Sequence, residues 1–330
     1  MPTQVYRTMR SKTGMYRTVF AGLVCAAVAL CPSLSEAQAP AKPKIPEPVD
    51  KTLSTKDGKE IRITYYGATA GKESPVVMLL HGKGGSRLIY NNAPQRAPIS
   101  LAKLLQQQGY AVVTVDLRGH GESSGGPGSA AGKKTDPQEL KGPDFRAMVG
   151  GDLEAVKGFL YDENQAQKLN MNKLASVAAD LMTPVAVAYT IEDWSKTPHD
   201  DAPVLMDRTP RGQDVKCLVL LSPENDTPSL SLTAGGLKLR ALGLPVMMAV
   251  GTKDSTSMSA ANKLFDQLVP KKQDTETVFL QKYDGKFRGT DLLYKPMNPP
   301  VEAHMVNFLE KSLKSLPGSW RDRRSRLNRD

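Results

Sequence analysis

The segment Asp116-Leu117-Arg118-Gly119-His120-Gly121-Glu122-Ser123 decides the fold of this chain. It directly follows residues 111–115, a short apolar run that is typical of a buried β-strand. Glycines and polar side chains immediately after such a run predict a tight turn at the carboxyl end of the strand. In open α/β sheets these ends carry the functional side chains, so the turn marks one edge of a candidate site.

Short apolar strands alternate with helical segments on both sides of this turn. The pattern predicts strands at 60–66, 76–80, 174–178, 215–221, 246–250 and 277–281, and helices within 99–108, 153–160, 184–191, 262–268 and 301–313. The strands are apolar on both faces, which indicates a sheet covered by helices on both sides. We therefore predict an α/β fold with a mostly parallel sheet.

Three motifs at strand ends, in this order, resemble the α/β-hydrolase fold family, in its secreted esterase, lipase or serine-aminopeptidase-like branch. The run His81-Gly82-Lys83-Gly84-Gly85 looks like the oxyanion-hole loop, and 116–123 is very similar to the family's D-x-R-G-H-G-x-S turn. Gly251-Thr252-Lys253-Asp254 looks like the turn that carries the catalytic acid. The resemblance covers residues 55–315 and implies the α/β-hydrolase fold. Only residues 222–244 are available for a cap, too few for a large cap domain.

The resemblance places the nucleophile elbow, G-x-S-x-G in the family, at Ala178-Ala179-Asp180-Leu181-Met182. Asp180 takes the serine position. Leu181 takes the position whose backbone N–H completes the oxyanion hole with the loop of His81, Gly82 and Lys83. Met182 replaces a glycine, and its long side chain argues against a sharp turn.

The family's H-G-x-x-L-L motif is similar to Arg288-Gly289-Thr290-Asp291-Leu292-Leu293, so Arg288 takes the position of the catalytic histidine. Arginine remains charged at any relevant pH and cannot act as a general base. Asp254 keeps the acid position. We therefore expect Asp180, Asp254 and Arg288 to converge, with Arg288 paired to both carboxylates.

Three hypotheses remain open. The first is a non-catalytic member of the fold, with the charged cluster in place of the triad. The second is a hydrolase in which Asp180 is a carboxylate nucleophile. The third is an ester or peptide hydrolase with a displaced triad, using Ser86, Ser123 or Ser222 with His81 or His120. The literal G-x-S-x-G at 121–125 has no helix after it and is interpreted as a chance match.

The ends of the chain indicate export. Residues 1–37 have a basic start, an apolar run of 14 residues and a small-residue site ending at Ala37, the pattern of a cleaved signal peptide. Residues 38–48 form a proline-rich linker, 49–316 the α/β-hydrolase-like domain, and 317–330 a basic tail. We expect the tail to be solvated, with weak contact to an anionic surface as the alternative. The predicted location is periplasmic or extracellular.

Other features of the composition predict no further chemistry. Cys217 is the one cysteine outside the signal and is expected to be a buried strand residue. The sequence shows no nucleotide-binding fingerprint, no metal-ligand spacing and no aromatic-interleaved basic stretch, so we expect no cofactor, no metal and no nucleic-acid partner. A small charged ligand at the former catalytic position remains open as a partner.

Overall fold

The computed structural model describes residues 44–94, 97–125, 135–269 and 276–329. The predicted signal peptide, 1–37, and the first part of the linker lie outside the described residues. No helix in the described ranges is both long enough and apolar enough to cross a membrane.

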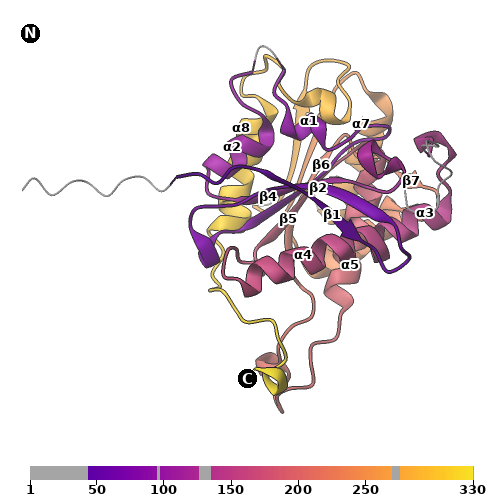
Figure 1. Ribbon diagram of the computed structural model, residues 1–330. Coiled ribbons are helices and arrows are strands. Elements are labelled where there is room, and N and C mark those ends of the chain that lie inside the picture. The colour runs from indigo at the N-terminus through magenta and orange to yellow at the C-terminus, as the bar shows by residue number, and fades with distance from the viewer. Residues whose placement is uncertain (1–43, 95–96, 126–134, 270–275, 330) are drawn as a thin grey trace, which may run out of the picture. The chain divides into compact units, whose positions relative to one another are not determined.

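The described residues form a central sheet of eight strands in the order β1-β2-β4-β3-β5-β6-β9-β10 (Figure 1). The strands are β1 Val49–Ser54, β2 Glu60–Tyr66, β3 Val76–Leu80, β4 Ala111–Asp116, β5 Leu174–Ala179, β6 Val215–Leu221, β9 Val246–Gly251 and β10 Val278–Tyr283. A short hairpin is made by β7, Asp226–Thr227, and β8, Leu230–Ser231. Within the eight-stranded sheet only the β1–β2 and β2–β4 pairs are antiparallel, so the predicted mostly parallel sheet is confirmed.

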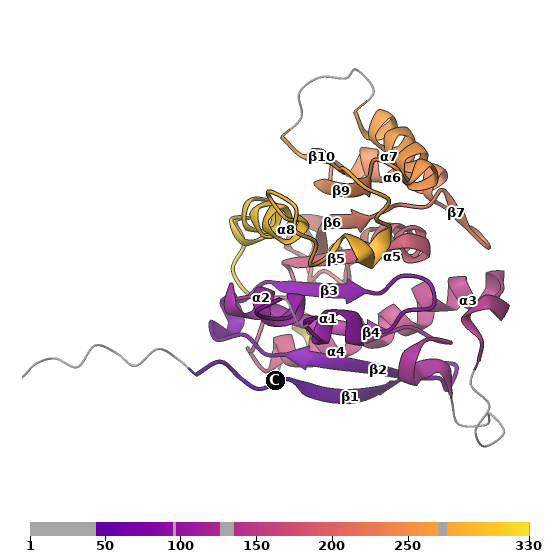
Figure 2. The same ribbon diagram turned by 90° about the horizontal axis from the view of Figure 1, so that it is seen from above.

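Helices cover both faces of the sheet (Figure 2). They are α1 Leu88–Asn91, α2 Leu101–Gln107, α3 Gly142–Ala147, α4 Leu153–Gln165, α5 Thr183–Ser195, α6 Leu232–Leu242, α7 Ser255–Leu268 and α8 Val301–Leu309. Alternate residues of one strand point to opposite faces. Thus Met78 and Leu80 of β3 pack with α4–α7, whereas Val77 and Leu79 pack with α1, α2 and α8.

Besides the short elements α1, α3, β7 and β8, the periodicity of the sequence missed β1 and α6. β1 is an edge strand whose Val49 is exposed, so its pattern carries little apolar signal. α6 contains Gly235 and Gly236, which lower helix propensity. A Cβ atom at Gly235 would lie 2.5 Å from Val187 of α5, so the glycine permits close helix packing at this point. The segment 222–245 holds this helix and the small hairpin, consistent with the expected lack of a large cap.

The basic tail is docked on the domain, so the expectation of a free, solvated tail is wrong for Trp320 and Arg323, while most other residues of 317–329 remain exposed. Arg323 is 3% exposed and forms an ion pair with the buried carboxylate of Asp214, just before β6. The indole N–H of Trp320 donates to the carbonyl oxygen of Asn164 at the end of α4. The tail docks because one of its arginines meets a buried acid. Cys217 is buried in β6, as predicted.

Strand register brings the candidate site together. Ala179 of β5 lies opposite Leu221 of β6, and Leu221 lies opposite Ala249 of β9. Residues that follow these strands therefore meet at one edge of the sheet. Asp180 follows β5 directly, so the predicted elbow stands at the centre of this edge.

Candidate functional site

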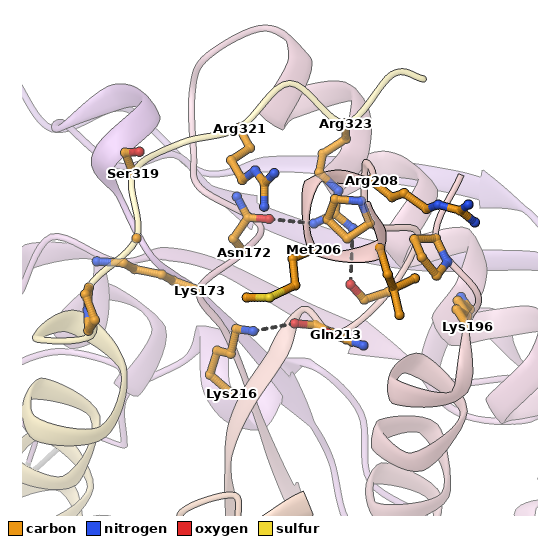
Figure 3. Close-up of a pocket in the computed structure, with 16 residues that line it drawn as sticks. Asn172, Lys173, Lys196, Met206, Arg208, Gln213, Lys216, Ser319, Arg321 and Arg323 are labelled. Carbon is orange, nitrogen blue, oxygen red and sulfur yellow. Dashed lines mark hydrogen bonds between the residues drawn. The ribbon is translucent and has the colours of Figure 1, made fainter. Parts of the chain in front are cut away.

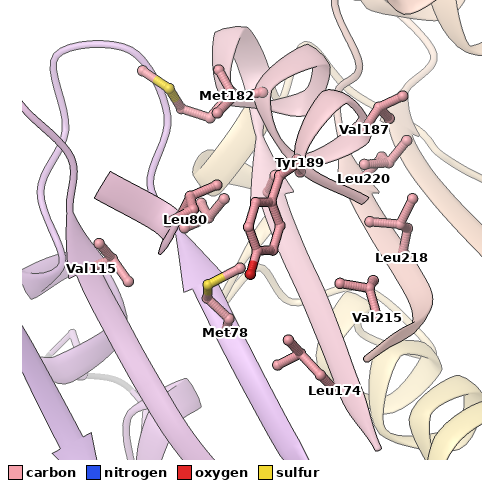
Figure 4. Close-up of a cluster of buried hydrophobic side chains, with 14 of the residues drawn as sticks. Met78, Leu80, Val115, Leu174, Met182, Val187, Tyr189, Val215, Leu218 and Leu220 are labelled. Carbon is pink, nitrogen blue, oxygen red and sulfur yellow. The ribbon is translucent and has the colours of Figure 1, made fainter. Parts of the chain in front are cut away.

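The elbow after β5 is sharp. Asp180 has φ +48°, in the left-handed region that non-glycine residues seldom adopt, and α5 begins three residues later at Thr183. Ala178 and Ala179 are fully buried and small enough for strand and helix to approach. The argument from Met182 against a tight turn was therefore wrong. The Met182 side chain is fully buried among the apolar residues between the sheet and its helices, away from the turn (Figure 4).

The hydroxyl of Thr183 fixes the elbow from the helix side. Its Oγ1 donates to the carbonyl oxygen of Asp180 at 2.7 Å. Oγ1 of Thr183 also accepts a hydrogen bond from the backbone N–H of Glu224, in the loop after β6, at 3.1 Å. One side chain thus connects the two loops that border the site.

Asp180 lies against two glycines. A Cβ atom at Gly82 would lie 2.3 Å from Oδ2 of Asp180, and one at Gly289 would lie 2.1 Å from the same oxygen. Gly289 also has φ +52°. The oxyanion-loop candidate Gly82 and the segment after Arg288 therefore both contact the Asp180 carboxylate, and a side chain at either position would displace it.

Arg288 reaches the elbow from the loop after β10. Its Nε lies 3.4 Å from Oδ1 of Asp180, and its Nη2 binds Oε1 of Glu224. Within the described residues Arg288 has no contact of 4.0 Å or less with Asp254, so the expected pairing with both Asp180 and Asp254 is not present. Glu224 takes the second place instead. It was missed because it lies more than 60 residues from Arg288 and belongs to no family motif.

The Asp180 carboxylate is poorly compensated. Its side chain is 16% exposed, and Oδ1 is buried without a hydrogen-bond partner in the described structure, so the contact with Arg288 is an ion pair only. Burial raises the pKa of Asp180 to about 6, and the attraction of Arg288 offsets this only in part. Glu224 and Asp254 add repulsion in the same direction.

Asp254 caps the helix that follows it. Its Oδ1 accepts from the backbone N–H of Ser257 in the first turn of α7, and its Oδ2 is buried without a hydrogen-bond partner among the described residues. The residue is 8% exposed. An acid stands where the resemblance places one, but no histidine faces it.

All four histidines of the chain lie in the described ranges, and none of their rings is hydrogen-bonded to Asp180 or Asp254. His81 is fully buried: its Nδ1 lies 2.8 Å from the carbonyl oxygen of Gly82, and its Nε2 accepts from the backbone N–H of Leu117. Burial lowers the pKa of His81 to about 3, so its ring is neutral. The His120 ring is tilted by 42° against the His81 ring, with 4.6 Å between centroids, and its Nδ1 lies 3.0 Å from the carbonyl oxygen of Arg118. Its Nε2 is buried without a hydrogen-bond partner among the described residues.

The other two histidines are far along the fold. The Nδ1 of His304 in α8 is 2.6 Å from the Tyr283 hydroxyl, and His199 lies in the loop after α5, where its backbone N–H bonds Thr209. No described serine hydroxyl is hydrogen-bonded to a histidine ring.

Of the three serines of the displaced-triad hypothesis, Ser86 is half-buried, and Ser123 and Ser222 are engaged or enclosed. Ser123 donates to the carbonyl oxygen of Asp116 and accepts from the backbone N–H of Arg62, so it fastens the turn 116–123 to β2. Ser222 is fully buried at φ +49°, and its Oγ has no partner in the described structure. Lys83, in the oxyanion-type loop, is exposed, and Leu181 is half-buried against the apolar core.

Comparison with known proteins agrees with this geometry. The sequence model of the alpha/beta hydrolase fold matches residues 75–235. The chain has the α/β-hydrolase fold. No curated protein matches it.

Solved structures show the same fold over most of the chain. A dienelactone hydrolase from Anabaena variabilis is 15% identical, with a TM-score of 0.55 over 82% of this chain and 100% of its own. An esterase from Pyrococcus furiosus is 16% identical, with a TM-score of 0.55 over 81% and 91%. An acylaminoacyl peptidase from Pyrococcus horikoshii is 14% identical, with a TM-score of 0.56 over 84% of this chain and 44% of its own. At these identities the likeness shows the α/β-hydrolase fold alone.

Within the described residues no group of three or more histidine, cysteine or acidic side chains is arranged to hold a metal ion. The site is thus a set of charges at the end of an α/β-hydrolase sheet. It joins a strained aspartate, an arginine and a glutamate from three separate loops.

Proposed function

We propose that this chain is a non-catalytic member of the α/β-hydrolase fold in which an ion-pair cluster replaces the triad. The observation that carries the proposal is Arg288, whose guanidinium bridges Asp180 and Glu224 where the base would act. Acyl transfer needs a nucleophile and a group that takes its proton. Arg288 cannot take a proton, and among the described residues no histidine ring is hydrogen-bonded to Asp180, Asp254 or a serine hydroxyl.

The role of the cluster is structural. Asp180 lies on the β5–α5 elbow, Glu224 on the loop after β6, and Arg288 on the loop after β10. One guanidinium therefore holds three loops at the carboxyl edge of the sheet. Bidentate or bridging arginine contacts fix geometry more strongly than a single lysine charge.

The carboxylate-nucleophile alternative is favoured by one observation, the positive φ of Asp180 on an intact elbow. A covalent ester on Asp180 would need a base to activate water for its hydrolysis. Glu224 is the nearest acid across the site, and it is paired to Arg288. The non-catalytic proposal therefore explains more of the geometry.

We also propose that the mature protein is exported and begins after Ala37. This rests on the sequence of residues 1–37 alone. Mass spectrometry of the protein recovered outside the cytoplasm tests this proposal. The mass should correspond to a chain that begins at residue 38, and an uncleaved amino terminus would contradict the proposal.

Esterase assays test the proposed function. In the presence of the purified protein, p-nitrophenyl acetate and butyrate should hydrolyse no faster than in buffer alone. No serine should react with a fluorophosphonate probe. The double variant Asp180→Ser/Arg288→His restores nucleophile and base on a preserved elbow, so weak esterase activity is expected from it. Asp180→Ser alone is the matched control and should remain inactive.

Turnover by the unmodified protein above the buffer rate would refute the proposal. If Asp180→Asn abolished such turnover, the carboxylate-nucleophile alternative would replace it. If a serine were labelled instead, the displaced-triad alternative would.

A further inference from the structure

A second cavity lies at the opposite edge of the sheet from Asp180. Its volume is about 510 Å³, and we call it the basic pocket (Figure 3). Asn172 and Lys173, which line it, directly precede β5, and Lys216 is the second residue of β6. Asp180 follows the other end of β5, so the length of that strand separates the two sites.

Two segments far apart in sequence wall the basic pocket. The loop after α5 contributes Met206 and Arg208, and the docked tail contributes Arg321 and Arg323. In the view of Figure 3, the two tail arginines project from above and Lys216 lies below them, with Met206 between. The carboxyl-terminal segment runs beside the same loop in Figure 1, and Arg326 and Arg329 bond it at Asp201 and Thr209.

The charges of the basic pocket are not balanced. Its lining contains six cationic side chains and no acidic one: Lys173, Lys196, Arg208, Lys216, Arg321 and Arg323. Three of them have acidic partners outside the lining, at Glu154, Asp200 and Asp214. Lys173, Lys216 and Arg321 have no acidic partner within 4.0 Å among the described residues.

The charged form of Lys216 is disfavoured by burial and by the neighbouring cation Arg323. Burial lowers the pKa of Lys216, and the charge of Arg323 acts in the same direction, while Asp214 and Asp193 offset it in part. Its Nζ donates to the carbonyl oxygen of Gln213. Asp214, the nearest buried acid, is already bound by Arg323 and Lys157.

Two hydrogen-bond donors in the wall are unsatisfied. Nδ2 of Asn172 and Nε of Arg323 are buried and have no partner within the described structure, and the Arg323 side chain is 2% exposed. The other ends of both groups bond each other, since Nη1 of Arg323 donates to Oδ1 of Asn172. Buried donors left open cost free energy unless an acceptor meets them. These two donors add to the excess of donors in the wall, and an acceptor-rich anion in the cavity would pair with the three cations that have no acidic partner.

The rim of the basic pocket is apolar on one side. Leu205 is 65% exposed and Met206 88% exposed, and both line the cavity. Large apolar side chains exposed at the edge of a polar cavity mark a surface that receives a partly apolar ligand.

We propose that the basic pocket binds an organic phosphate monoester with an apolar body. The doubly charged head would contact Arg321, Lys216 and Lys173, and the body would lie against Leu205 and Met206. Three unpaired cations favour a dianion over a single carboxylate. This site is independent of the proposed function at Asp180.

Titration calorimetry of the purified full chain at low ionic strength, with phenyl phosphate as the probe, tests the proposal. Saturable one-to-one binding is expected. Lys216→Gln/Arg321→Gln should weaken it at least about tenfold, because it removes two of the three cations that would contact the phosphate. The matched control Lys103→Gln/Lys282→Gln removes the same charge from exposed positions on α2 and β10 and should bind as the unmodified protein does. Arg321 is exposed, so Arg321→Gln alone provides a folded variant if the double variant is unstable.

The probe series distinguishes the parts of the ligand. Inorganic phosphate and benzoate should each bind more weakly than phenyl phosphate. No saturable binding of phenyl phosphate, or an equal loss in the control variant, would overturn the proposal. Equal affinity for inorganic phosphate would overturn the assignment of an apolar body.

Discussion

The two edges of the sheet, at the carboxyl and amino ends of its parallel strands, differ in how their charged side chains are paired. At the carboxyl edge, Arg288 lies between the acids Asp180 and Glu224, and the three loops are bridged through it. At the amino edge, the buried acid Asp214 is saturated by Arg323 and Lys157, and the surrounding cavity keeps an excess of cations. At the carboxyl edge one arginine is thus shared by two acids, whereas at the amino edge cations and buried donors outnumber their partners among the described residues.

The largest expected effect concerns the docking of the tail at the amino edge. Arg323→Ala leaves Asp214 with Lys157 alone and removes the contact to Asn172, so we expect the free energy of unfolding to fall by about 3–5 kcal/mol, the range for breaking a buried ion pair. Urea denaturation measures it. Arg324→Ala is the control: Arg324 is exposed and pairs with Asp322 on the surface, so its loss should leave the free energy of unfolding almost unchanged. Similar costs for both variants would show that the tail adds no stability at this edge.

At the carboxyl edge, Asp180→Asn tests how the free energy of unfolding depends on pH. The pKa of Asp180 is about 6 when folded and near 3.8 when unfolded. Between these values the folded state keeps a proton that the unfolded state releases, so the stability of the protein falls as pH rises from about 4 to 6. The asparagine variant escapes this loss. It should match the unmodified protein below pH 4 and exceed it by about 3 kcal/mol above pH 7, at 1.36 kcal/mol per pKa unit.

Thermal or chemical denaturation between pH 3.5 and 8 measures the stability difference between Asp180→Asn and the unmodified protein. Asp266→Asn in α7 serves as the control because Asp266 is exposed, and its effect should stay within about 0.5 kcal/mol at every pH. A destabilised Asp180→Asn protein at pH 8 would mean that the ion pair with Arg288 outweighs the burial of the carboxylate.

Gly289→Ala separates backbone strain from contact with the Asp180 carboxylate. The substitution adds a methyl group at φ +52° and 2.1 Å from Oδ2, so we expect a loss of about 2 kcal/mol in the free energy of unfolding. Gly243→Ala has a similar φ, +65°, with no atom within 4 Å of the added carbon, and should cost about 1 kcal/mol. In an Asp180→Ala background the cost at Gly289 should fall to that of Gly243. An unchanged cost there would place the clash elsewhere.

The sequence by itself determined the layers of this protein and the positions that a triad would occupy. Strands and helices follow from local periodicity, and the turn 116–123 and the elbow 178–182 are contiguous motifs whose order fixes the fold. The assignment of Asp180 to the serine position and of Arg288 to the histidine position is a prediction from the same contiguous motifs.

Only the tertiary structure decided what those positions contact. The positive φ of Asp180 and the burial of Met182 depend on how β5 and α5 pack, which residue spacing does not specify. Glu224 meets Arg288, and Arg323 meets Asp214, across 64 and 109 residues of chain. Pairings at that separation are set by strand order and register, because the fold brings together charges that no local pattern connects.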